Sequence, residues 1–154
     1  MGSEISGGIR NVTIRSCLMD NENWSPLRFK SQPSRGGTVE NITFEHITIK
    51  GARSIFDINM EWRMVPPLSP AHYPLTCLRN IHFKNINGEA QSAGTMYGFK
   101  EAPFGNDTFF FENCHIKAQK GLSISNVANV NFKGLELEIK EGEKIYERSA
   151  NKDK

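Results

Sequence analysis

The sequence has no long apolar run and no strong excess of charge of either sign. No stretch approaches the roughly 18 apolar residues that a membrane span needs, so we expect no membrane association. Its 19 basic and 17 acidic residues leave a net charge of +2, which is too small a surplus to indicate nucleic-acid binding. A length of 154 residues suits one soluble domain with a usable core.

Cysteine is also scarce. Cys17, Cys77 and Cys114 cannot all pair within one chain, and no Cys-x-x-Cys pair or Cys/His cluster indicates zinc. We therefore expect three buried free thiols, no metal and no cofactor. The N-terminus shows no basic stretch followed by an apolar segment, so no signal peptide is visible. We interpret its abrupt glycine-rich opening as the start of a truncated chain.

Helical periodicity is almost absent, whereas one strand-like segment recurs along the chain at uneven spacing. The copies are N-V-T-I-R-S-C (11–17), N-I-T-F-E-H-I (41–47), N-I-H-F-K-N-I (80–86), T-F-F-F-E-N-C (108–114) and N-V-N-F-K-G-L (129–135). Uneven spacing is typical of a solenoid in which the strands stack in register while the connecting loops differ in length.

Aligned copies show apolar columns with the two-residue period of a strand. The predicted interior columns are Val12, Ile42, Ile81, Phe109 and Val130; Ile14, Phe44, Phe83, Phe111 and Phe132; and Cys17, Ile47, Ile86, Cys114 and Leu135. A charged column between them alternates in sign: Arg15, Glu45, Lys84, Glu112 and Lys133. Opposite charges on adjacent parallel strands attract modestly, which favours coil-on-coil stacking.

The position after each charged residue is small, polar or glycine. It holds Ser16, His46, Asn85, Asn113 and Gly134. Such residues suit a sharp bend in the left-handed region, so we interpret His46 as a turn residue rather than a metal ligand. The outward positions of His82 and His115 carry the same interpretation.

Together these patterns predict an all-β fold, a right-handed parallel β-helix (a single-stranded β-solenoid) of about five coils over residues 1–140. The proline-rich segment Arg63–Pro74 is predicted to be a loop, and residues 141–154 a loose polar tail. The first strand, with Val12 and Ile14 near the end of the core, would be left bare. We therefore expect a homo-oligomer, most simply a dimer, joined through the N-terminal coil.

Two ordered motifs resemble bacterial members of glycoside hydrolase family 28, the polygalacturonases and related pectinases. One is G-S-E-I-S-G-G-I-R-N-V (2–12); the other is L-R-F-K (27–30) followed by R-G-G-T-V-E-N-I-T-F (35–44). The resemblance implies that Arg28 and Lys30 bind the carboxylate of a galacturonate unit beside the cleaved bond. It also implies that Trp62 stands where the family has an aromatic residue, usually tyrosine, although packing is an equal possibility for Trp62.

The family's catalytic aspartates lie in elements that precede the G-S-E stretch, and none has a counterpart in this chain. The resemblance thus implies the C-terminal part of a hydrolase of α-1,4-galacturonan-type pectin, inactive as an isolated chain. Its partner would be an acidic pectic polysaccharide, bound weakly, and its parent enzyme would be secreted or periplasmic. An alternative is a non-catalytic β-helix scaffold or acidic-polysaccharide-binding domain. A pectate lyase would need a calcium site of clustered acids, which the sequence does not show.

Overall fold

The computed structural model describes residues 1–20, 24–62, 70–71 and 74–148, and this part of the chain contains strands and no helix. Accordingly, it holds no helix that could cross a membrane. The strands are β1 (Ile9–Asp20), β2 (Leu27–Lys30), β3 (Thr38–Asn59), β4 (Cys77–Tyr97), β5 (Phe109–Glu112), β6 (Cys114–Ser125) and β7 (Leu135–Glu147).

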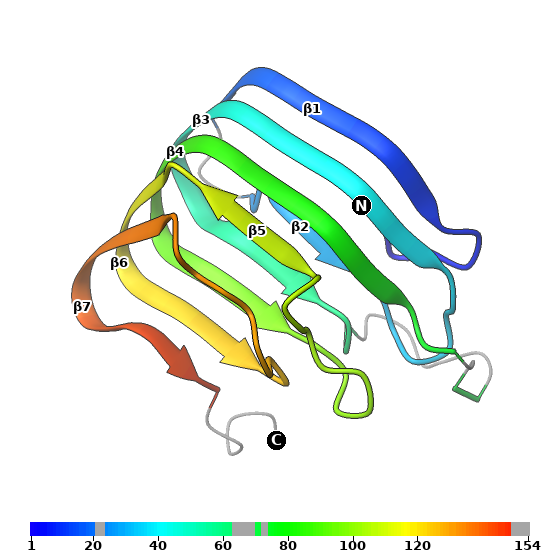
Figure 1. The fold of residues 1–154 in the computed structure, drawn as a ribbon. Coiled ribbons are helices and arrows are strands. Elements are labelled where there is room, and N and C mark those ends of the chain that lie inside the picture. The colour runs from blue at the N-terminus through cyan, green and yellow to red at the C-terminus, as the bar shows by residue number, and fades with distance from the viewer. Residues whose placement is uncertain (21–23, 63–69, 72–73, 149–154) are drawn as a thin grey trace.

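Every strand pairing is parallel, and the long bent strands stack in the order β1-β3-β4-β6-β7, as Figure 1 shows. The short strands complete the coils, with β2 pairing with β3 and β5 with β4. The predicted all-β parallel β-helix is therefore confirmed. Its register also follows the predicted columns, because Ile14, Phe44, Phe83 and Phe111 occupy successive paired positions.

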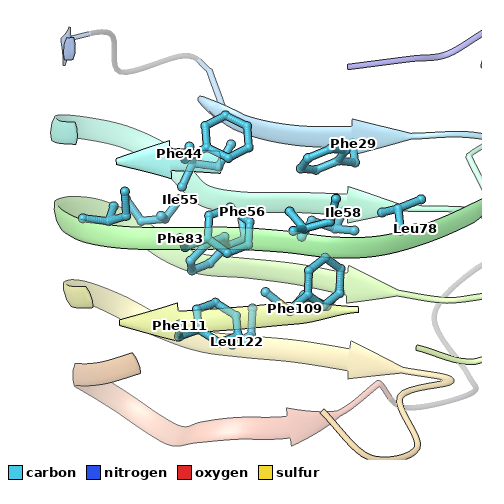
Figure 2. Close-up of a cluster of buried hydrophobic side chains, with 14 of the residues drawn as sticks. Phe29, Phe44, Ile55, Phe56, Ile58, Leu78, Phe83, Phe109, Phe111 and Leu122 are labelled. Atoms are coloured by element: carbon cyan, nitrogen blue, oxygen red, sulfur yellow. The ribbon is translucent and has the colours of Figure 1, made fainter. Parts of the chain in front are cut away.

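The central members of the predicted columns are buried in the core, which also contains residues outside those columns, such as Phe29, Phe56 and Leu122 (Figure 2). The members of the predicted columns in the first and last coils are only partly buried. The rings of Phe44 and Phe83 stack with centroids 5.5 Å apart, and those of Phe83 and Phe111 lie 5.4 Å apart. The stack continues from Phe111 to Phe132 at 5.8 Å. Repetition of one residue type at one position in each coil thus builds a continuous aromatic spine.

The outward charged column is confirmed as a series of neighbouring positions, with Arg15 opposite Glu45, Glu45 opposite Lys84, and Lys84 opposite Glu112. Only the last of these pairs approaches as an ion pair, at 3.6 Å. Because these groups lie in solvent, the column favours the register without adding much stability.

The predicted bend column is confirmed by the backbone. All five positions have positive φ: Ser16 (53°), His46 (54°), Asn85 (52°), Asn113 (51°) and Gly134 (93°). A second left-handed column lies near the start of the long strands, with asparagine at positions 11, 41 and 80. There Asn41 donates its Nδ2–H to Oδ1 of Asn11 at 2.9 Å, and Asn80 donates to Asn41 at 2.7 Å. These asparagines hold the corners of consecutive coils together.

Replacing the middle residue of this ladder tests its contribution. Asn41→Ala removes two side-chain hydrogen bonds and forces an alanine into the left-handed region, so we expect a loss of about 2 kcal/mol in the free energy of unfolding. Asn41→Gly removes the same bonds but accepts the backbone conformation, so it should cost about half as much. Urea unfolding measures both, and equal losses would mean that the backbone conformation contributes nothing.

The expectation of a loose polar tail needs correction. Residues 141–147 are not a loose tail, because β7 runs to Glu147 and pairs Ile145 with Leu122. The register of the β6–β7 pairing shifts between Lys120 and Leu122. Charged residues of β7 lie opposite this irregularity and interrupt the apolar alternation, so the sequence pattern did not indicate that the strand continues. Residues 149–154 lie outside the described residues, as does most of the predicted loop Arg63–Pro74.

The three cysteines are free thiols, as predicted, but they are not all buried. Cys114 is fully buried, and burial raises the pKa of its thiol. Cys17 is half-buried, since no described strand covers the outer side of β1, and Cys77 is exposed at the first position of β4. The prediction of burial was therefore wrong for Cys77, which precedes the apolar columns instead of belonging to one.

Candidate functional site

The strand β2 presents its two basic residues outward because its apolar residues alternate with them. Leu27 and Phe29 are fully buried, so Arg28 and Lys30 both emerge on the outer face. Pairing with β3 sets Arg28 opposite Asp57 and Lys30 opposite Asn59. The final segments of β3, β4 and β6 continue this face along the stack (Figure 1).

Trp62 lies against Lys30. The Nζ atom of Lys30 is 3.9 Å from the centroid of the Trp62 ring, a cation–π contact. The backbone N–H of Trp62 donates to the carbonyl of Ser31 at 3.0 Å, which fixes the chain after β3 beside the end of β2. The structure therefore brings together two of the three predicted site residues, and leaves Trp62 partly exposed.

Arg28 lies beside an acidic neighbour that the sequence analysis missed. Its Nε is 2.7 Å from Oδ2 of Asp57, with both side chains partly exposed. This contact is an ion pair without hydrogen-bond alignment, because the buried Nε–H has no acceptor in line. Asp57 occupies an outward position of the segment I-F-D-I-N, and that alternation is the signal that could have identified it.

The N-terminal residue runs alongside β2 and adds a third basic group. The ammonium of Met1 donates to the carbonyl of Arg28 at 2.6 Å, and the carbonyl of Met1 accepts from the N–H of Lys30 at 3.0 Å. Burial lowers the pKa of this ammonium, and the charges of Arg28 and Lys30 lower it further. Burial and the neighbouring positive charges therefore disfavour the protonated form of this amine.

Comparison of the chain with protein-family models gives a match. The family model described as Glycosyl hydrolases family 28 matches residues 1–136. The chain belongs to glycosyl hydrolase family 28. It is accordingly of the polygalacturonase type of glycoside hydrolase, and the resemblance inferred from the two motifs is confirmed. No curated protein matches the chain.

Beyond Trp62, the family 28 chain carries a second aromatic and charged group on the same face. The guanidinium of Arg148 lies 4.6 Å from the ring centroid of Tyr97, and its Nη1 is 4.0 Å from Oε2 of Glu61. The hydroxyl of Tyr97 is 3.0 Å from Oγ of Ser123. These residues lie in segments outside the repeated motif, so the repeat alignment gave no signal for them.

The described part of this family 28 chain contains no group of three or more His, Cys, Asp or Glu side chains placed to hold a metal ion. His115 is engaged by Glu136 at 2.9 Å and by Asn113 at 2.9 Å. His82 contacts Asn80 and stacks on Phe110 with centroids 4.8 Å apart. The outward histidines thus contact side chains of neighbouring turns.

Proposed function

We propose that this chain is the C-terminal part of a galacturonan hydrolase, and that the face around β2 binds the carboxylate of a galacturonate unit. The observation that carries the proposal is the cluster of Lys30 against Trp62, with Arg28 two positions earlier on the same face. Family membership supports the substrate class, since the matched region contains all three residues.

The chemistry of the three side chains suits an acidic sugar. A guanidinium grips a carboxylate with two parallel hydrogen bonds, and an ammonium adds a point charge. The contact of Asp57 with Nε of Arg28 occupies one edge of the guanidinium and orients its other nitrogens. An indole ring gives an apolar surface for the face of a pyranose, and a few polar groups beside it set the orientation.

Calorimetric titration with trigalacturonate tests this proposal. We expect weak binding that falls with added salt, and a loss of about tenfold or more in the variant Arg28→Ala/Lys30→Ala, because charge-assisted hydrogen bonds are removed. The control Arg15→Ala/Lys50→Ala removes the same charge from β1 and β3, outside the positions that pair with β2, and should leave affinity unchanged. Neutral galactotriose should not bind. Equal affinities for both double variants would refute the assignment.

We also propose that the isolated chain does not cleave its ligand. An inverting glycosidase needs one carboxylic acid for the leaving oxygen and one carboxylate to activate water. On the described face, Asp57 is held by Arg28 at 2.7 Å and Glu61 lies 4.0 Å from Arg148. Both acids thus contact arginines through ion pairs, so neither stands free to take one of these two roles.

Incubation with polygalacturonate should release no reducing ends above the blank. Robust hydrolysis that disappears in Asp57→Asn or Glu61→Gln would place the chemistry on this face and contradict the proposal. The same pairing of acids with arginines favours the second candidate function, a non-catalytic domain that binds acidic polysaccharide. The sequence encoded upstream distinguishes the two, because the family's catalytic aspartates, if encoded there, would indicate a truncated enzyme.

A further inference from the structure

A groove of about 550 Å³ lies beside Arg28, on the side away from Trp62. Its lining includes Trp24, Arg28, Arg53, Asp57, Ser92 and Thr95. The volume falls within the range that accommodates a small ligand. Small residues make the hollow, because β4 contributes serine, glycine and threonine to its wall.

Trp24 and Arg53 give this groove an aromatic surface and a second cation. Trp24 is 61% exposed, which is unusual for so large an apolar side chain. The N–H of Arg53 donates to the carbonyl of Trp24 at 3.2 Å, so the two residues lie at the same level of adjacent coils. Arg53 is exposed and has no carboxylate partner among the described residues, whereas Arg28 has Asp57. The groove therefore carries two guanidiniums and one carboxylate.

The neighbouring side chains hold the groove's wall in place. Oγ of Ser25 and Oγ of Ser54 are 2.5 Å apart, which joins the residue after Trp24 to the residue after Arg53. Ser92 donates to the carbonyl of Gly121 at 3.3 Å, and it also accepts from the N–H of Gly94 at 3.0 Å. The serines thus brace successive coils, and this leaves the indole and the Arg53 guanidinium to face the groove.

We propose that Trp24 and Arg53 form a second subsite, which binds another acidic sugar unit of the same saccharide. The inference rests on the proposed function of the Arg28, Lys30 and Trp62 face. Trp24 supplies an apolar surface for the sugar ring, and Arg53 supplies the charge for its carboxylate. Chemically this repeats the pairing of Trp62 with Lys30, at the opposite end of β2.

The arrangement predicts a preference for longer ligands. Asn59 of β3 pairs with Lys30, and Arg53 lies earlier on the same strand, with Asp57 between them. At the rise per residue of a β-strand, Arg53 and Asn59 are separated by about 20 Å. A ligand that reaches from Lys30 to Arg53 must therefore contain several sugar units. Joining two weak subsites through one chain raises affinity without any new contact.

Fluorescence of Trp24 tests the second subsite. In a Trp62→Phe background Trp24 is the one remaining tryptophan, since the chain has two. Tetragalacturonate should change its emission saturably, whereas digalacturonate should bind more weakly. Adding Arg53→Ala should weaken tetragalacturonate binding about tenfold, as expected for one charge-assisted contact. Adding Arg15→Ala instead, which removes the same charge elsewhere, should leave it unchanged.

The outcomes separate this inference from the proposed function. An unchanged Trp24 emission, together with binding that depends on Arg28 and Lys30, overturns the second subsite and leaves the proposed function in place. Binding that depends on Arg53 but not on Arg28 or Lys30 overturns the proposed function. Equal affinities of the Arg53→Ala and Arg15→Ala variants also overturn the second subsite.

Discussion

Phe83→Ala should lower the free energy of unfolding by about 3–5 kcal/mol, the usual cost of truncating a buried phenylalanine. Phe83 is fully buried, and its ring stacks on Phe44 and Phe111 and meets the edge of Phe56 at 5.2 Å. The ring centroid of Phe109 lies 6.3 Å from that of Phe83. Removal of Phe83 therefore leaves a cavity bordered by four other rings, at the centre of the spine (Figure 2). For a chain of this size the midpoint of thermal unfolding should fall by about 10 °C.

The control for this prediction is Phe110→Ala. Phe110 is 40% exposed and stacks on His82 at the outer surface, so its truncation should cost less than about 1 kcal/mol. Chemical denaturation followed by circular dichroism measures both variants. If Phe83→Ala and Phe110→Ala lose similar stability, the aromatic spine is not the main support of the fold.

The second large effect concerns association: we propose that the chain forms a dimer through its N-terminal coil. Among the described strands β1 pairs only with β3, so its other edge is open along Ile9–Asp20. Val12 and Ile14 are half-buried, whereas their partners Ile42 and Phe44 in the next coil are buried. Covering this apolar end is favourable at about 25 cal/mol per Å², and an unpaired edge offers backbone partners.

A two-fold arrangement is favoured over stacking in one direction. At the opposite end β7 is dense in charged residues, and charge protects an edge strand from pairing. Two copies of β1 in parallel register would also place Arg10 on Arg10 and Arg15 on Arg15, which like-charge repulsion disfavours. An end-to-end contact about a two-fold axis perpendicular to the strands makes the two copies of β1 antiparallel, which avoids both problems and closes the assembly.

Light scattering over a dilution series should give a mass near twice 17.4 kDa at high micromolar concentration, falling on dilution. Val12→Lys should give a monomer at all concentrations, because its ammonium would have to be buried in the contact. Ile139→Lys, at a half-buried position of the last coil, is the matched control and should remain dimeric. A wild-type chain that is monomeric throughout would disprove the N-terminal contact.

Much of the fold could be predicted because each coil must satisfy the same physical requirement at the same position. Phe44, Phe83 and Phe111 fill one interior column, and the left-handed bends recur at Ser16, His46 and Asn85. Because each coil needs the same type of residue at the same position, that residue type recurs along the sequence. The spacing of copies therefore gave both the pairing partners and the register.

The rest of the site was not predicted because it lies outside the repeated motif, although alternation within β3 places Asp57 on the outer face. Asp57 reaches Arg28 through the second half of β3, after the register irregularity between Ile49 and Ala52. Trp24 and Arg53 meet because β2 and β3 belong to successive coils joined by loops of unrelated sequence. Motif matching identified Arg28, Lys30 and Trp62, whereas their neighbours depended on how these loops are placed.

The indole N–H resonance of Trp62 gives the most direct test of whether this face binds an acidic saccharide. The two tryptophans give two indole signals, which Trp24→Phe and Trp62→Phe assign. In a titration with digalacturonate, the Trp62 signal should move saturably, because the sugar carboxylate reaches Lys30, which lies 3.9 Å from the ring. The shift should disappear in Arg28→Ala/Lys30→Ala. A Trp62 signal that stays fixed while the ligand binds elsewhere would contradict the assignment of this face.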